Sequence, residues 1–83
     1  MKTIILTPSA ARDLDALPAA ARDQITDALN RYAVSGLGDV KRLSGRNEYR
    51  LRIGRYRVLF EEDQITILAI YIGKRETTTY RRN

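Results

Sequence analysis

The 83-residue chain has no cysteine and no histidine. Without cysteine, neither disulfides nor thiolate–metal sites can stabilise it. Without histidine, it lacks the most common zinc ligand and the usual general acid or base near neutral pH. Any hydrolytic chemistry must therefore use arginine, lysine, tyrosine or carboxylate side chains, and the sequence indicates no metal and no other cofactor.

Long hydrophobic runs are also missing. The apolar run after Met1 is too short for a signal peptide, and no stretch reaches the ~20 apolar residues that cross a bilayer. We therefore expect a cytoplasmic protein with no membrane contact. A chain of 83 residues makes one domain, residues 1–83, which buries only about 60–65% of its unfolded surface.

The net charge of +5 is distributed unevenly. Residues 1–45 carry six basic and five acidic side chains, whereas residues 46–83 carry nine basic and five acidic ones. A basic balance alone is weak evidence, because many soluble proteins are basic. Its concentration in one region favours an anionic partner such as nucleic acid.

The first part of the chain predicts a strand and two helices. Thr3 to Leu6 is short and β-branched, as in a strand, and Thr7 before Pro8 is typical of a helix start. We expect helices at 9–16 and 18–34, the second ended by Gly36. Their apolar stripes predict a two-helix hairpin on one face of a sheet. The stripes are Ala10, Leu14 and Leu17 in the first helix, and Ile25, Ala28, Leu29 and Tyr32 in the second.

Two alternating runs, 49–53 and 56–60, predict a β-hairpin with one buried and one wet face. A two-residue turn at Gly54-Arg55 sets a register in which every inward pair is apolar or aromatic, which marks the core face. The expected pairs are Ile53 with Tyr56, Leu51 with Val58, and Tyr49 with Phe60.

A third run, 65–72, is apolar on both faces, as in a central strand. One face would hold Ile65, Ile67, Ala69 and Tyr71, and the other Leu68, Ile70 and Ile72. We place this run between the 56–60 strand and the first strand, and expect residues 36–47 to form a loop anchored by Val40 and Leu43. The prediction is an α+β fold: an N-terminal strand, a two-helix hairpin, then a three-stranded antiparallel meander. These strands form a four-stranded sheet with helices on one face, followed by a short C-terminal tail or helix.

On the wet face of the hairpin, Arg52 is expected opposite Arg57, with Arg50 two positions along. Like charges directly opposite destabilise a sheet, so the cluster favours an anion site, although a solvated strand face is the alternative. Arg75 and, if the tail folds back, Tyr80 would join it. Guanidinium groups bind phosphodiester oxygens and can stabilise a pentacoordinate transition state.

Other residues of this region are weaker candidates. Rim charges are expected at Arg55 and Lys74. Arg81 and Arg82 are expected either to contact the nucleic-acid backbone or to make no functional contact. Either a base or a counter-charge for arginine is expected at Glu48 and Glu76. Core packing is expected of Tyr49, Tyr56 and Tyr71, and docking of the tail is the alternative for Tyr80.

The segments 43–45 and 49–60, and the run Ile72-Gly73-Lys74-Arg75-Glu76, resemble the RelE/ParE superfamily of bacterial and archaeal toxins. The order of strand, two helices and three strands extends the resemblance over nearly the whole chain. It implies a small α+β toxin encoded beside an antitoxin. In the RelE branch it implies a ribosome-dependent endonuclease that cuts mRNA in the decoding site.

By position, the resemblance implies catalytic roles for Arg50, Arg52, Arg57, Arg75 and Tyr80. The first two match a basic pair on the first hairpin strand, and Arg57 matches an arginine that holds a phosphate. Arg75 matches an arginine assigned to the leaving group or the transition state, and Tyr80 a proposed base for the 2′-hydroxyl. Attack by that hydroxyl would leave a 2′,3′-cyclic phosphate and a 5′-hydroxyl. The best-known relatives have lysine at the paired strand positions, and their spacing from arginine to tyrosine differs by a residue.

Three hypotheses follow. The first is a RelE-like mRNA interferase that acts on message held by the ribosome and has a cognate antitoxin as partner. The second is a ParE-like toxin that poisons DNA gyrase; such chains generally lack the arginine and tyrosine constellation, so its presence favours the first. The third is a catalytically inert basic module that binds its antitoxin and, through that complex, operator DNA.

Overall fold

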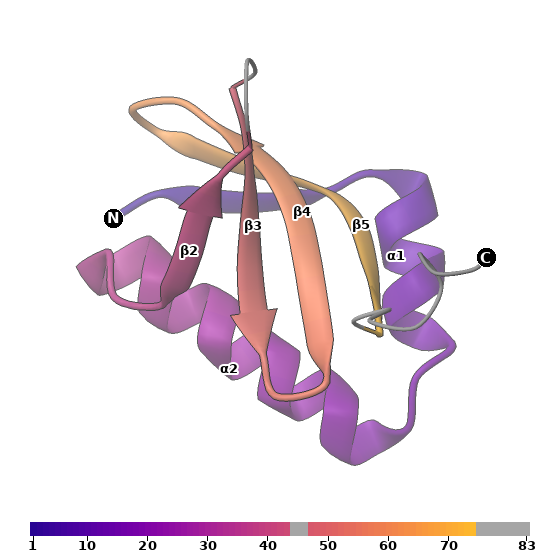
Figure 1. The fold of residues 1–83 in the computed structure, drawn as a ribbon. Helices are drawn as coiled ribbons and strands as arrows, with labels where there is room; N and C mark the ends of the chain where they lie inside the picture. The colour runs from indigo at the N-terminus through magenta and orange to yellow at the C-terminus, as the bar shows by residue number, and fades with distance from the viewer. Residues whose placement is uncertain (44–46, 75–83) are drawn as a thin grey trace, which may run out of the picture.

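The computed structural model describes residues 1–43 and 47–74, which form two helices and a five-stranded sheet (Figure 1). The elements are β1 (Thr3–Leu6), α1 (Pro8–Asp15), α2 (Ala19–Ser35), β2 (Asp39–Arg42), β3 (Glu48–Ile53), β4 (Tyr56–Glu62) and β5 (Thr66–Lys74). The strand order is β1-β5-β4-β3-β2, with β1 parallel to β5 and the other described neighbours antiparallel. Both helices pack on one face, and we call the other face, which neither helix covers, the open face.

The α+β class and the place of β5 between β4 and β1 are confirmed, but the sheet has five strands and not four. Residues 39–42, expected within a loop, form the edge strand β2 against β3. Their sequence, Asp-Val-Lys-Arg, contains one apolar side chain and so gives no clear alternation. An edge strand needs only one inward anchor, here Val40 opposite Leu51, and charged residues are common on such strands.

The sequence signals at the helix ends are confirmed, with boundaries shifted by one residue. The backbone N–H of Ala10 donates to Thr7 Oγ1 at 3.1 Å, so Thr7 caps α1, and Pro8 occupies its first turn. Pro18 precedes α2, and Gly36 ends it with a φ of +76°, the left-handed conformation that favours glycine. No helix in the described ranges is long and apolar enough to cross a membrane.

The predicted register of the β3–β4 hairpin is confirmed throughout. The turn at Gly54 and Arg55 has its positive φ, +56°, at the glycine. The inward pairs are Ile53 with Tyr56, Leu51 with Val58, and Tyr49 with Phe60. The predicted core packing of Tyr49 and Tyr56 is also confirmed, since both lie against the buried cluster.

The predicted alternation in β5 is wrong beyond Ala69. Leu59 of β4 pairs with Tyr71, but the next residue of β4 pairs with Ala69, so Ile70 is an extra residue in β5. This β-bulge puts the following residues one step out of the original alternation. As a result Ile72 joins Ala69 in the core, and Tyr71 turns to the open face.

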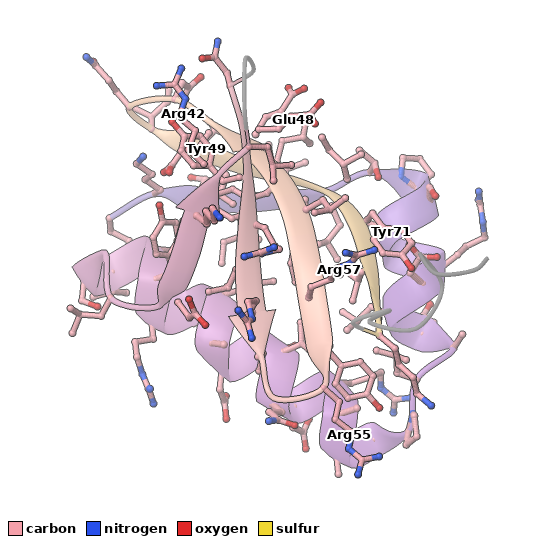
Figure 2. The ribbon with its side chains drawn as sticks, viewed as in Figure 1. Arg42, Glu48, Tyr49, Arg55, Arg57 and Tyr71 are labelled. Carbon is pink, nitrogen blue, oxygen red and sulfur yellow. The ribbon has the colours of Figure 1, made fainter. Side chains whose placement is uncertain are left out.

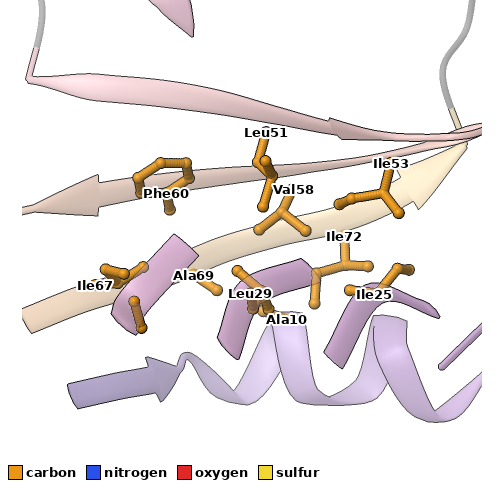
Figure 3. Close-up of a cluster of buried hydrophobic side chains, with 11 residues drawn as sticks. Ala10, Ile25, Leu29, Leu51, Ile53, Val58, Phe60, Ile67, Ala69 and Ile72 are labelled. Carbon is orange, nitrogen blue, oxygen red and sulfur yellow. The ribbon is translucent and has the colours of Figure 1, made fainter. Parts of the chain in front are cut away.

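The core lies between the helices and the sheet (Figure 3). The stripe predicted for α2 is confirmed, with Ile25 and Leu29 buried against the strands. Phe60 is fully buried and makes ring contacts with Tyr32 and Tyr49, each with centroids 5.5 Å apart. The fold is therefore stabilised mainly from one side of the sheet.

A polar contact closes the edge of this face. Glu62 of β4 accepts a hydrogen bond from the Tyr32 hydroxyl at 2.5 Å and another from the Lys2 ammonium. Burial, with the hydrogen bond to Glu62 and the charge of Glu62, raises the pKa of Tyr32 above its usual range. Lys2, Tyr32 and Glu62 thus partner one another at this edge.

Candidate nucleic-acid interface

Three arginines proposed for the site lie on the open face of the sheet. Side chains alternate along a strand, so Arg50 and Arg52 of β3 point away from the core that Leu51 enters. Arg57 of β4 pairs directly with Arg52, which confirms the predicted like-charge pair. Figure 2 shows Arg57 on the side of the sheet turned away from the helices.

Lys41 of β2 adds a fourth cation to this group. Its ladder partner is Arg50, which places both on the same face. Sequence reasoning missed Lys41 because residues of an expected loop are assigned to no face. One apolar residue between two charged ones, Val40 between Asp39 and Lys41, is too short an alternation to have assigned Lys41 to a face. We call Lys41, Arg50, Arg52 and Arg57 the cationic cluster.

The Nε atoms of the three arginines in the cationic cluster lack hydrogen-bond partners within the described residues. The Nε atoms of Arg50, Arg52 and Arg57 are shielded from solvent, and none has a hydrogen-bond partner in residues 1–43 and 47–74. Asp39 Oδ2 lies 3.7 Å from Arg52 Nε, which is an ion-pair distance but too long for a hydrogen bond. Shielded N–H groups normally find an acceptor, and a bound anion would supply charge-assisted ones here.

Tyr71 is a member of this face that sequence reasoning placed wrongly. It was expected in the core, yet the bulge at Ile70 turns it outward and leaves it 37% exposed. The guanidinium carbon of Arg57 lies 5.8 Å from its ring centroid, a cation–π contact (Figure 2). No glycine or proline marks the bulge in the sequence, so no local signal could have revealed it.

The other end of the open face is acidic. Glu48 and Glu61 pair across β3 and β4, at the end of the hairpin farthest from its turn. In the part of the chain that the structure describes, no three acidic side chains gather closely enough to hold a metal ion. Because Glu48 and Glu61 lie at one end of the hairpin and Arg52 and Arg57 lie nearer its turn, the charge of the open face changes sign along the hairpin. A polyanion would be attracted to the half that contains the two arginines.

The remaining candidates fall outside the cationic cluster. Arg55 is exposed at the tip of the hairpin (Figure 2). Lys74 pairs with Tyr56, which packs on the core side, so the alternation assigns Lys74 to the helix-covered face and not to the arginine face. The candidates that lie outside the described residues are Arg75, Glu76, Tyr80, Arg81 and Arg82.

Solved toxin structures share this fold. The isolated RelE toxin of E. coli superposes with a TM-score of 0.79 at 16% identity, over 96% of this chain and 92% of that one. The RelE–RelB complex of Pyrococcus horikoshii gives 0.78 at 20% identity, over 93% and 98%. The RelB–RelE complex of Methanococcus jannaschii gives 0.73 at 24% identity, over 90% and 94%. At these identities the likeness establishes the fold.

Family membership comes from the sequence comparison. No curated protein sequence matches the chain. The family model described as the ParE toxin of the type II toxin–antitoxin system parDE matches residues 4–78. This match spans most of the chain and confirms the expected RelE/ParE superfamily. The chain therefore belongs to the ParE toxin family of type II toxin–antitoxin systems.

Proposed function

We propose that this toxin is a RelE-like mRNA interferase, a ribosome-dependent endonuclease that acts in the cytoplasm and arrests growth by cutting translated message. The observation that carries the proposal is the set of three shielded Nε atoms, on Arg50, Arg52 and Arg57, with no hydrogen-bond partner among the described residues. A strand face required only for solubility would not set Arg52 against Arg57. A phosphodiester strand offers acceptors of matching charge and geometry.

In this proposal Arg50, Arg52 and Arg57 bind the RNA phosphates around the cleavage point. Tyr80 removes the proton of the 2′-hydroxyl, whose oxygen attacks the adjacent phosphorus. The bond from phosphorus to the 5′-oxygen breaks, and Arg75 stabilises the departing oxygen, which takes a proton from solvent. The products are a 2′,3′-cyclic phosphate and a 5′-hydroxyl. Since a free tyrosine titrates near pH 10 and arginine is a poor base, Tyr80 needs cationic neighbours to act as the base in this proposal.

A cognate antitoxin is the proposed protein partner. Support comes from the family, and from solved relatives in which RelE is bound to RelB. We expect a helical antitoxin segment with acidic or apolar side chains to cover the cationic cluster. Operator DNA would then be contacted through the toxin–antitoxin complex.

Two alternatives remain in view. The description of the matching family favours a ParE-like poison of DNA gyrase. A catalytically inert module that binds only its antitoxin and operator is the other. In the gyrase case, the cationic cluster would serve a protein or DNA contact and message would stay intact.

The test is to add purified toxin to translating ribosomes and map message ends by primer extension. We expect cuts within the decoding site, and a strong loss of cutting in Arg57→Ala, Arg75→Ala and Tyr80→Phe. Arg31→Ala, which removes an exposed arginine from α2, is the matched control and should cut normally. Intact message together with gyrase–DNA cleavage complexes would support the gyrase poison. If neither effect is seen, the inert module that binds its antitoxin is supported.

A further inference from the structure

We infer that Tyr71 is a stacking platform for a base of single-stranded RNA, beside the phosphate site formed by Arg57. The inference rests on the proposed function, in that both require RNA on the open face. It differs in assigning base contact to a residue that the proposed cleavage steps do not use.

The bulge determines where Tyr71 lies. Without the extra residue Ile70, position 71 would alternate into the core, as Ile67 and Ala69 do. With it, the tyrosine emerges on the open face opposite Leu59, which is half-buried on the same face. A large aromatic ring is thereby brought to the open face between Arg57 and Leu59.

The position of the ring is also fixed by Gly73. A Cβ atom built on Gly73 would lie 2.3 Å from the Tyr71 hydroxyl oxygen and 2.7 Å from Cζ, so the phenol lies directly over this glycine. Gly73 is in turn the ladder partner of Arg57, whose guanidinium contacts the ring. Backbone and cation together hold the ring beside the sheet, with 37% of the residue still exposed.

This arrangement matches the two parts of a nucleotide. The phosphate needs a charged donor, and the shielded Nε of Arg57 has no described acceptor. The base presents a flat π face, and proteins that bind single strands stack such faces on exposed aromatic rings next to cationic grooves. Tyr49 and Tyr56 do not offer this, because both pack against the core.

The test measures binding of short single-stranded RNA to the full chain off the ribosome. One oligoribonucleotide carries 2-aminopurine, whose fluorescence is quenched by stacking, and a second of equal length consists of abasic ribose-phosphate units. We expect wild-type protein to quench the first and bind both. Tyr71→Ala and Tyr71→Leu should weaken binding of the base-containing strand by roughly 5- to 100-fold, whereas Tyr71→Phe should stay within about twofold.

The abasic strand separates stacking from a merely structural role. If Tyr71 stacks a base, binding of the abasic strand changes by less than about twofold in Tyr71→Ala, because only phosphate contacts remain. Equal losses for both strands would mean that Tyr71 only positions Arg57, and would overturn the inference. Unchanged affinity in Tyr71→Ala, or no RNA binding by the wild type, would overturn it as well.

Two controls keep the result distinct from the proposed function. Ile65→Ala removes an exposed apolar side chain immediately before β5 and should leave both affinities unchanged. Wild-type toxin is assayed for message cutting in parallel. If cutting is absent while the base-dependent loss in Tyr71→Ala persists, the endonuclease proposal fails and the stacking site stands. If cutting occurs but Tyr71→Ala shows no base-dependent loss of affinity, the endonuclease proposal stands and the stacking site fails.

Discussion

The two faces of the sheet differ in how well their side chains are buried and paired. On the helix-covered face, side chains such as Phe60 and Val58 are completely buried, and the polar edge group Glu62 has two partners. On the open face, Arg52 stands against Arg57, and both have shielded N–H groups without described acceptors. The comparison indicates that stability comes mainly from one face, which allows the other to keep a like-charge pair that Asp39 and Tyr71 offset only in part.

In the β3–β4 hairpin, neighbouring residues of a strand point to opposite faces of the sheet. Successive positions of β4 alternate between the core and the open face, so adjacent substitutions should have different consequences. Changes at inward positions should lower the free energy of unfolding. Changes at outward positions should alter RNA binding and leave the fold intact.

The largest expected effect is that of Phe60→Ala. Removing a fully buried ring that contacts Tyr32 and Tyr49 should lower the free energy of unfolding by about 3–5 kcal/mol. Urea unfolding followed by circular dichroism measures this. Leu59→Ala, one residue earlier on the open face, is the matched control and should lose clearly less. Similar losses of unfolding free energy in the two variants would contradict the conclusion that stability comes mainly from the helix-covered face.

A smaller effect is expected for Tyr32→Phe, which tests the paired polar edge. The variant removes the hydroxyl that donates to Glu62 and should cost about 1.5–3 kcal/mol at neutral pH. The pKa of Tyr32 is raised in the folded state. The hydroxyl therefore makes its full contribution to the free energy of unfolding below pH ~10, the pKa of tyrosine in the unfolded chain, and this contribution is lost as pH rises through the folded pKa.

Unfolding of both proteins at pH 8 and pH 11 measures this dependence. The gap in unfolding free energy between wild type and Tyr32→Phe should narrow at the higher pH. Comparing the two proteins cancels the titration of lysines common to both. A gap that stays constant or widens would show that the hydroxyl does not stabilise the fold through Glu62.

The parts of the fold predicted correctly from the sequence rest on local chemistry. A threonine before a proline starts α1, a glycine ends α2, and the alternation around Gly54 fixes the hairpin register. Each signal lies within a few residues of the structure it determines. This is why the positions of Arg50, Arg52 and Arg57 on one face could be inferred without coordinates.

The parts that escaped prediction depend on how a segment pairs with its neighbouring strand, and not on the residues of the segment alone. β2 is defined by its pairing with β3, and the bulge at Ile70 by the shift in register where β5 pairs with β4. Neither has a local signature. Lys41 and Tyr71 were missed, or placed wrongly, for this reason, since each takes its direction from one of these two features.

Arg52→Thr should have a modest effect of opposite sign on stability and binding. Removing the like-charge partner of Arg57 should raise the free energy of unfolding by about 0.2–1 kcal/mol, because threonine suits a strand and ends the repulsion. RNA affinity should fall, and the slope of log affinity against log salt should lessen by about 0.7 if one phosphate contact is lost. A variant that is less stable, with an unchanged salt slope, would show that Arg52 serves the fold.

The smallest expected effect is a gain of affinity in Asp39→Asn. Asp39 Oδ2 lies 3.7 Å from Arg52 Nε, in a pair that is largely exposed, so its loss should change the free energy of unfolding by less than about 0.5 kcal/mol. RNA binding should improve by roughly two- to fivefold at low salt, because a competing carboxylate has gone. The gain should vanish near 1 M salt, where the Debye length is about 3 Å.

Asp27→Asn on α2 is the control for this gain, since it removes the same charge from an exposed helix position. If the advantage of Asp39→Asn comes from its place beside the cationic cluster, Asp27→Asn should improve binding distinctly less. Equal gains would mean that net charge alone drives association. In that case the open face would attract RNA only through the amount of its charge, and the arrangement of Arg50, Arg52 and Arg57 would not define a site.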